Sequence, residues 1–225
     1  MKRLIYHILT FLVKREKLLA ILADKQEKEL LKFTKEGYLY EIGWTNSMAT
    51  GSVVDQQNMP LPWVTYPYIR FISSRLNKKM EIFEFGSGNS TIFYADRTAG
   101  VHSVEHDKFW YDKIKNLMPP NVNLNYCELT ADGNYCRYAL ATSMKYDIII
   151  VDGRDRVNCC KNSIAALKPG GVLVLDDSER EKYTAGITYL GENGFKRIDF
   201  WGMAPTVNYH KCTAIFYRGN NCLGI

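Results

Sequence analysis

The chain has 225 residues, of which 46% are hydrophobic and 24% are charged, and this composition excludes a disordered or fibrous protein. The formal net charge is +5, and residues 1–35 carry all of it; the neutral remainder is not expected to bind nucleic acid, which needs concentrated Lys and Arg. The six cysteines form no CxxC pair, and a chain of this length needs no disulfides to fold, so we expect reduced thiols and a cytoplasmic protein.

An amphipathic helical segment is predicted over residues 1–36. Its apolar run Leu4–Val13 is too short to cross a membrane, and the charged residues 14–17 stand where a signal peptide would have its cleavage site. One face of such a helix collects the apolar residues Ile5, Ile8, Leu9, Leu12, Leu19 and Leu22. Residues 1–22 fit two roles: packing on the domain or on a second copy of the chain in a homo-oligomer, or peripheral contact with an anionic membrane surface.

A cover segment and a helix are predicted over residues 37–80. Residues 38–64 are rich in aromatic residues and proline and show little periodicity, which indicates an ordered loop that serves as a lid or as a wall of a substrate pocket. A helix is expected to begin at Thr65, with Pro67 in its first turn and Tyr68 on its apolar face.

Residues 81–225 alternate strands and helices. Strands are predicted at residues 81–85, 101–105, 122–127, 146–151, 172–175, 195–201 and 212–217. Helices are predicted from about residue 90 and over residues 108–117, 135–142, 157–167 and 179–190. The β-branched run Ile148–Val151 suits a strand that is covered on both faces. This alternation predicts an α/β protein with a Rossmann-like, doubly wound and mostly parallel sheet of seven strands.

Three acids stand at the carboxyl ends of predicted strands, where doubly wound sheets bind their ligands. Glu84 precedes the turn Gly86-Ser87-Gly88, whose glycines permit a sharp bend and close approach of a ligand to the backbone. Its carboxylate stands where it can meet an ammonium group. Glu105 ends the second strand, where an acid can accept the hydroxyl groups of a ribose, and Asp152 ends the fourth.

The motifs EFGSGNS (84–90), VEHD (104–107), YDIIIVDGR (146–154) and LKPGGVLVLDD (167–177) resemble those of class I S-adenosylmethionine-dependent methyltransferases. The resemblance covers residues 81–218 and implies an antiparallel last strand and S-adenosylmethionine as the cofactor. The residues that it assigns to the methyl donor are Glu84, Gly86, Ser87, Gly88, Ser90, Glu105 and Asp152. The aromatic residues before residue 81 also resemble those of methyltransferases associated with bacterial surface polysaccharides. Hydrophobic packing of a cover segment over the edge of the sheet explains these residues equally well.

Two other functions compete with methyl transfer. An NAD-dependent oxidoreductase would need a third glycine at position 91, which is Thr, and would not explain an acid at position 84. A non-catalytic Rossmann-like binding module would have no reason to retain Glu84, both glycines and Glu105 together.

The acceptor of the methyl group is expected to be a hydroxyl. Enzymes that methylate amide or base nitrogens commonly carry an Asn/Asp-Pro-Pro-aromatic motif after the fourth strand, and this chain has Asp152-Gly153-Arg154-Asp155 there. We therefore expect O-methylation of a carbohydrate, a glycolipid or another small molecule. Arg154 is a candidate to bind an acidic acceptor, or to pair with Asp155.

A divalent cation such as Mg²⁺ is a specific candidate for activating the acceptor hydroxyl. Asp152 with the pair Asp176-Asp177 resembles the ligands of catechol-type O-methyltransferases, although Asp177 replaces an Asn of that pattern. The competing interpretation is that Asp177 caps the next helix and Asp176 faces solvent. Without a metal, the reaction needs a protein base. The candidates are His210, in the loop 203–211, and the acids Asp152 and Asp155.

Overall fold

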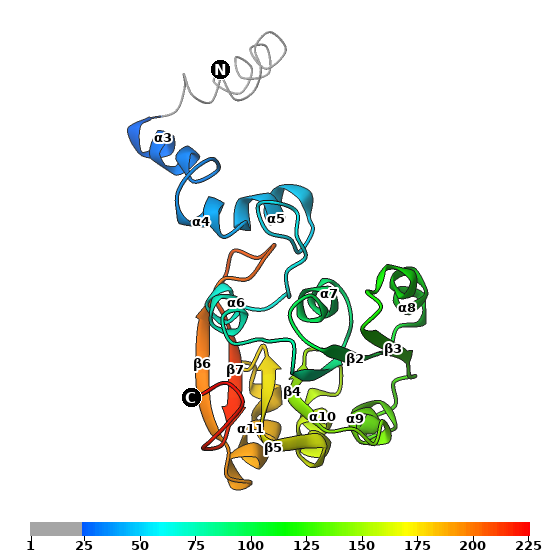
Figure 1. Ribbon diagram of the computed structural model, residues 1–225. Coiled ribbons are helices and arrows are strands. Elements are labelled where there is room, and N and C mark those ends of the chain that lie inside the picture. Colours follow the sequence, from blue (N-terminus) through cyan, green and yellow to red (C-terminus); the bar gives the residue numbers. More distant parts are fainter. Residues whose placement is uncertain (1–23) are drawn as a thin grey trace.

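Seven strands form one sheet in residues 24–225, the part of the chain that the structure, a computed structural model, describes (Figure 1). The strands are β1 Glu81–Phe85, β2 Gly100–Glu105, β3 Val122–Tyr126, β4 Tyr146–Val151, β5 Leu167–Asp176, β6 Lys196–Gly202 and β7 Lys211–Tyr217. Their order across the sheet is β3-β2-β1-β4-β5-β7-β6. Strands β1 to β5 pair in parallel, and β7 is antiparallel to both β5 and β6. The predicted fold class, including the antiparallel last strand, is confirmed.

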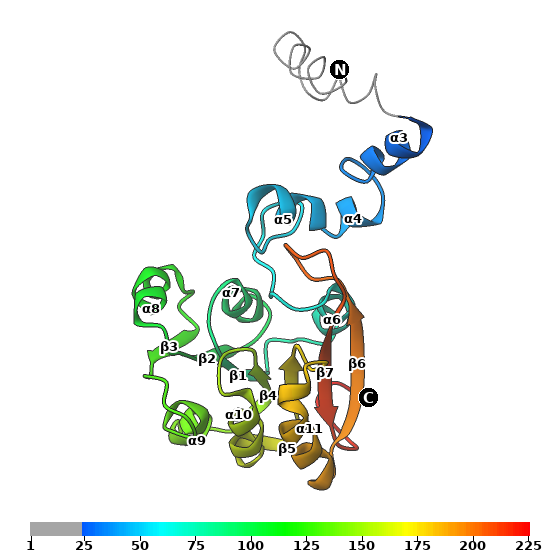
Figure 2. The same ribbon diagram turned by 180° about the vertical axis from the view of Figure 1, so that it is seen from behind.

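Helices cover both faces of the sheet, as the two opposite views show (Figures 1 and 2). One face carries α6 Tyr66–Ser73, α7 Asn89–Ala95 and α8 Lys108–Ile114; the other carries α9 Tyr138–Ala141, α10 Arg156–Ser163 and α11 Thr184–Glu192. Short 3₁₀ turns, η1 Lys115–Leu117, η2 Tyr135–Arg137, η3 Ile164–Ala166 and η4 Glu181–Tyr183, extend several of these helices. This two-sided cover explains why β4 is apolar from Ile148 to Val151.

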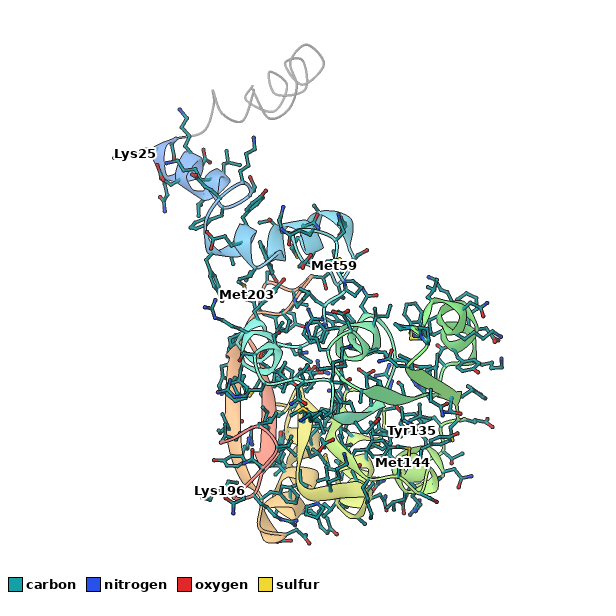
Figure 3. The ribbon with its side chains drawn as sticks, in the orientation of Figure 1. Lys25, Met59, Tyr135, Met144, Lys196 and Met203 are labelled. Atoms are coloured by element: carbon teal, nitrogen blue, oxygen red, sulfur yellow. The ribbon has the colours of Figure 1, made fainter. Side chains whose placement is uncertain are left out.

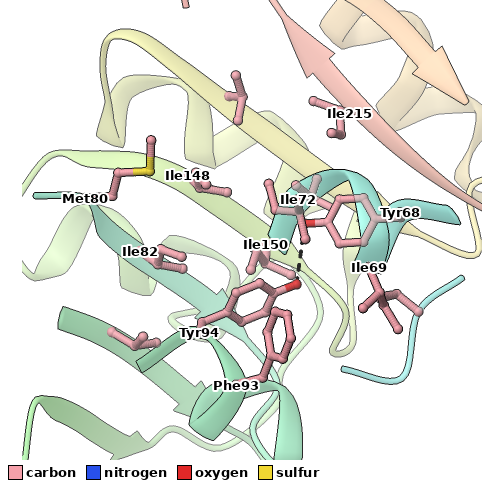
Figure 4. Close-up of a cluster of buried hydrophobic side chains, with 14 of the residues drawn as sticks. Tyr68, Ile69, Ile72, Met80, Ile82, Phe93, Tyr94, Ile148, Ile150 and Ile215 are labelled. Carbon is pink, nitrogen blue, oxygen red and sulfur yellow. Dashed lines mark hydrogen bonds between the residues drawn. The ribbon is translucent and has the colours of Figure 1, made fainter. Parts of the chain in front are cut away.

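Two apolar clusters fill the space between the sheet and its helices. Successive side chains of a strand point to opposite faces, so Ile148 and Ile150 join the cluster under α6 and α7, whereas Ile149 joins the other. Figure 4 shows the first cluster, in which the hydroxyl groups of Tyr68 and Tyr94 meet at 3.4 Å. Each buried isoleucine contributes about 1.5–3 kcal/mol to stability. Together these contacts fix the strand ends on which the polar residues stand.

The N-terminal half of the cover segment is helical, and the predicted ordered loop over residues 38–64 is wrong there. Helix α3 spans Lys25–Lys32, and two short helices follow, α4 Tyr38–Glu41 and α5 Trp44–Thr50. Helices of four and seven residues are too short to display a 3.6-residue period, so the sequence pattern does not reveal them. Residues 51–65 are irregular, as predicted, apart from an isolated bridge.

The segment α3 to α4 extends away from the sheet (Figure 1), and α3 buries none of its residues. Residues 1–23, which hold the apolar face assigned to membrane or subunit contact, lie outside the described residues. Within residues 24–225, every helix is too short or too polar to span a lipid bilayer.

The predicted turn at residues 169–171 is part of β5. Gly170 has a φ of +77°, and the pairing register shifts between Tyr146, opposite Leu167, and Ile148, opposite Val172. The extra residues form an irregularity at the beginning of the strand, far from the end that carries Asp176.

Candidate active site

The glycine turn after β1 brings two loops into close contact. Gly86 has a φ of +90°, and a Cβ added there would lie 3.2 Å from the Cα of Gly153, in the loop after β4. A Cβ added at Gly88 would meet only Trp110, at 3.9 Å, so this side of the turn is open. Gly86 is therefore required by the backbone, whereas Gly88 leaves space for a ligand.

Glu84 lies under this turn and is almost completely buried. The hydroxyl of Thr91 donates to its Oε2 at 2.5 Å, and the backbone N–H of Gly88 donates to the same hydroxyl at 3.0 Å. Burial raises the pKa of Glu84 to about 7, against the opposing effect of hydrogen bonds from Ser90 and Thr91. A cationic group placed beside this carboxylate would restore its charge, so Glu84 is suited to bind one.

Glu105 approaches the same turn from the end of β2. Its Oε2 accepts the backbone N–H of Ser87 at 3.2 Å, and its Oε1 accepts those of His106 and Asp107, each at 2.8 Å. The Ser87 side chain is bonded in turn to Ser103 of β2, at 2.6 Å between the hydroxyl oxygens. The structure thus brings Glu84, Glu105 and the glycine turn together; that they bind the methyl donor remains a prediction.

Three aromatic residues that sequence reasoning missed surround this turn. Trp110 of α8 donates from Nε1 to the carbonyl of Ser87 at 2.9 Å. Tyr135 is fully buried below Gly153, and its hydroxyl has no hydrogen-bond partner among the described residues. The ring of His106 packs against Tyr135 at 5.9 Å, and Figure 3 shows where Tyr135 lies in the fold. Tyr135 lies 30 positions from Glu105 in the sequence, so no local sequence pattern predicts that it lies near the glycine turn.

The cover segment is hydrogen-bonded to α7 and to the loop between β6 and β7. The side-chain amide of Asn89, in the first turn of α7, donates to the carbonyl of Val53 at 2.8 Å. Two indoles bond to the loop between β6 and β7: Trp44 donates to Val207 at 2.7 Å and Trp63 to Pro205 at 2.9 Å. Figure 3 shows Met59 of the cover segment and Met203 of this loop on the side of the sheet nearest α5. These bonds fix the cover segment on the domain, and its role as a wall of a pocket stays a prediction.

The three predicted metal ligands converge, but side-chain cations of the same chain hold them. Nη2 of Arg156 lies 2.9 Å from Oδ1 of Asp152. Nζ of Lys211 lies 2.5 Å from Oδ2 of Asp176 and 2.7 Å from Oδ1 of Asp177. Strands β4 and β5 are neighbours, as the prediction required, and Lys211 enters from β7.

The set does not fit a divalent cation. Among residues 24–225, no group of three or more His, Cys, Asp or Glu side chains is arranged to hold a metal ion. The competing interpretation also fails, because Asp176 is only 1% exposed and Asp177 binds Lys211, Arg156 and Arg180 through its side chain. A lysine that begins the last strand, 35 positions after Asp176, gives no local signal of this pairing.

One carboxylate oxygen of Asp152 is left without a hydrogen bond by the described residues. Its hydrogen bond to Arg156 uses Oδ1, and within the described part of the chain Oδ2 makes no hydrogen bond. Burial and the charge of Asp176 raise the pKa of Asp152 well above its usual range, whereas Arg156 and Lys211 lower it. A raised pKa makes the ionised carboxylate a stronger base, which suits Asp152 to accept a proton from a bound hydroxyl.

The other two predicted catalytic residues lie at the surface. His210 is exposed, and the centre of its ring lies 5.4 Å from that of Trp201. Trp201 points to the face of β6 opposite to the face that carries Phe200. Arg154 is exposed, and in residues 24–225 its side chain forms no ion pair, so the suggested pair with Asp155 is absent there. These positions favour Asp152 over His210 as the base.

All six cysteines are free thiols, as predicted.

Comparison with known proteins shows the fold. No protein-family model matches the sequence, and no curated protein matches it. A methyltransferase-like protein from Silicibacter pomeroyi is 20% identical over 71% of this chain and 89% of its own, with a TM-score of 0.53. Precorrin-6y C5,15-methyltransferase from Geobacter metallireducens is 17% identical over 67% and 87%, with a TM-score of 0.51.

An rRNA methylase from Streptococcus thermophilus is 14% identical over 70% of this chain and 99% of its own, with a TM-score of 0.50. The chain has the Rossmann-like fold of these methyltransferases. Its antiparallel β7, inserted between β5 and β6, departs from the 3-2-1-4-5-6 order of dinucleotide-binding sheets.

Proposed function

We propose that this protein is an S-adenosylmethionine-dependent methyltransferase. The observation that carries the proposal is the attachment of two buried carboxylates, Glu84 and Glu105, to one glycine turn at the ends of β1 and β2. Glu84 would hold the ammonium group of the donor and Glu105 its ribose hydroxyl groups, with the open side of Gly88 against it. S-adenosylmethionine, when bound, supplies a sulfonium methyl group for transfer.

The acceptor in this proposal is a hydroxyl of a carbohydrate, a glycolipid or another small molecule. Transfer to a hydroxyl needs a group that removes its proton, and Oδ2 of Asp152 is the free basic atom at the end of β4. Arg156 orients this carboxylate through the other oxygen. The aromatic cover segment supports a flat or sugar-like acceptor, because aromatic faces pack well against such molecules.

Calorimetry with S-adenosylmethionine tests the donor. We expect saturable binding by the wild-type protein, strong weakening in Glu105→Ala, and no comparable binding of NAD. Absence of binding by the folded wild-type protein would favour a non-catalytic binding module. Binding of NAD alone would favour an oxidoreductase. A scan of sugars and lipid-linked sugars with labelled donor then identifies the acceptor.

We also propose that the protein is cytoplasmic and that its basic segment, residues 1–22, contacts the surface of an anionic membrane. Five more basic than acidic residues in residues 1–35 support this idea, as does the neutrality of the rest. The alternative is packing of this segment on the domain itself or on a second copy of the chain in a homo-oligomer. Deletion of residues 1–20 is expected to reduce partitioning onto liposomes that contain anionic lipid; unchanged partitioning, with a loss of oligomer in sedimentation, favours the alternative.

A further inference from the structure

Lys211 and Arg156 occupy the acidic cluster Asp152–Asp176–Asp177 at the ends of β4 and β5. We infer that these two side chains take the place of a divalent cation in the cluster, so that the protein binds no metal there. The consequence that methyl transfer proceeds without a metal rests on the proposed function, whereas the absence of metal binding does not.

Lys211 uses the oxygens that a metal would need. Its Nζ bridges Asp176 and Asp177 at 2.5 and 2.7 Å, and the hydroxyl of Thr213 donates to the second oxygen of Asp176 at 2.7 Å. The ammonium group therefore already engages one oxygen of each carboxylate, and Thr213 engages the second oxygen of Asp176.

Arg156 is bound too firmly to leave. Its guanidinium donates to the carbonyls of Asp176, at 2.5 Å, of Asp152, at 3.0 Å, and of Gly153, at 3.1 Å, in addition to its ion pair with Asp152. Displacing it would leave three backbone carbonyls without these bonds and one carboxylate without a partner. Breaking a buried ion pair by losing one partner is strongly destabilising. Lys211 is therefore the cation whose removal would expose the cluster.

A divalent ion would meet both a lack of ligands and repulsion. Mg²⁺ needs about six oxygen ligands in octahedral geometry. Oδ2 of Asp152 is the oxygen of the cluster that the described residues leave free, and two positive groups lie beside it. Replacing Lys211 by Met removes one of these charges, frees one oxygen on each of Asp176 and Asp177, and leaves two adjacent carboxylates that repel each other.

Mn²⁺ titration followed by electron paramagnetic resonance tests the inference directly. We expect no saturable binding by the wild-type protein or by Lys211→Arg up to millimolar Mn²⁺. Lys211→Met is expected to bind Mn²⁺ at least about tenfold more tightly than the wild type, because the cluster gains a net negative charge. Adding Asp176→Asn to this variant should remove the gained binding. Lys168→Met is the matched control, since it breaks a Lys–Asp pair of 2.7 Å with Asp147 at the other end of β4.

Two results would overturn the inference: saturable Mn²⁺ binding by the wild-type protein that Asp176→Asn removes, or a folded Lys211→Met that binds Mn²⁺ no better than the Lys168→Met control. Circular dichroism establishes the folding of each variant. If Lys211→Met does not fold, the comparison of wild type, Lys211→Arg and Asp176→Asn decides alone. Donor binding is measured separately, so its failure would contradict the proposed function without affecting the Mn²⁺ result.

Discussion

Binding of the methyl donor is expected to release a proton from Glu84. This carboxyl is buried, and its pKa is raised from 4.5 to about 7, chiefly by burial. In the donor-free protein it is therefore partly protonated at neutral pH. An ammonium group of a ligand requires the ionised form, so donor affinity should rise about tenfold per pH unit below pH 7 and level off above it.

The same shift makes the donor-free protein less stable at higher pH. A folded-state pKa above the unfolded value means that the folded protein binds the proton more tightly. The stabilisation is complete below pH 4.5 and is lost as the pH rises through about 7. The size of the shift corresponds to about 3 kcal/mol of unfolding free energy, because one pKa unit is worth about 1.4 kcal/mol. Bound donor is expected to reverse this loss.

Calorimetric titration with S-adenosylmethionine from about pH 5.5 to 8.5, in buffers of different ionisation enthalpy, measures both the affinity and the proton released. Glu84→Gln should bind weakly and show a flat pH profile. Glu81→Gln, at the other end of β1, should keep the wild-type profile. A wild-type affinity that does not change over this range, or an unchanged profile in Glu84→Gln, would refute the assignment of Glu84 to the ammonium group.

Three further substitutions probe the crevice. Gly86→Ala should lower the unfolding free energy in urea by about 1–3 kcal/mol and weaken donor binding, because the residue needs a φ of +90° and its Cβ would crowd Gly153; wild-type stability would contradict this. Asp152→Asn should slow methyl transfer about 10²–10⁴-fold while donor affinity changes little, and equal loss of donor binding would mean that Asp152 holds the donor instead. Tyr135→Phe should raise the unfolding free energy of the donor-free protein by about 1–3 kcal/mol, because it removes a buried hydroxyl without a partner; a less stable variant would reveal a partner such as a buried water.

The strands were predictable because their signals are local. The β-branched run of β4 and the apolar run of β1 give strand bounds that agree with the structure, with Glu84 near the end of β1 and Asp152 directly after β4. The cover segment was harder, since α4 and α5 are too short for periodicity and depend on Gly43 and Gly51 in left-handed conformation at the ends of α5.

The pairing of the acids was not predictable from local pattern. Asp176 and Thr213 become neighbours only because β7 inserts antiparallel beside β5, and that register places Lys211 against the end of the strand. Nothing in the residues around position 211 distinguishes this lysine from a surface one. Sequence reasoning therefore located the acidic cluster and misjudged its charge.

The charge of the two halves of the crevice separates the candidate ligands. In residues 24–225, Glu84 and Glu105 form no ion pair with Lys or Arg, whereas Asp152 and its neighbours are paired with Arg156 and Lys211. Unit charges 4 Å apart interact by about 4 kcal/mol at the effective dielectric constant of a protein surface. An ionised Glu84 beside Glu105 therefore favours a cationic ligand at the glycine turn, whereas the paired acids at the ends of β4 and β5 offer little attraction to a cation. This difference supports the proposed sulfonium donor, whose ammonium group would bind Glu84.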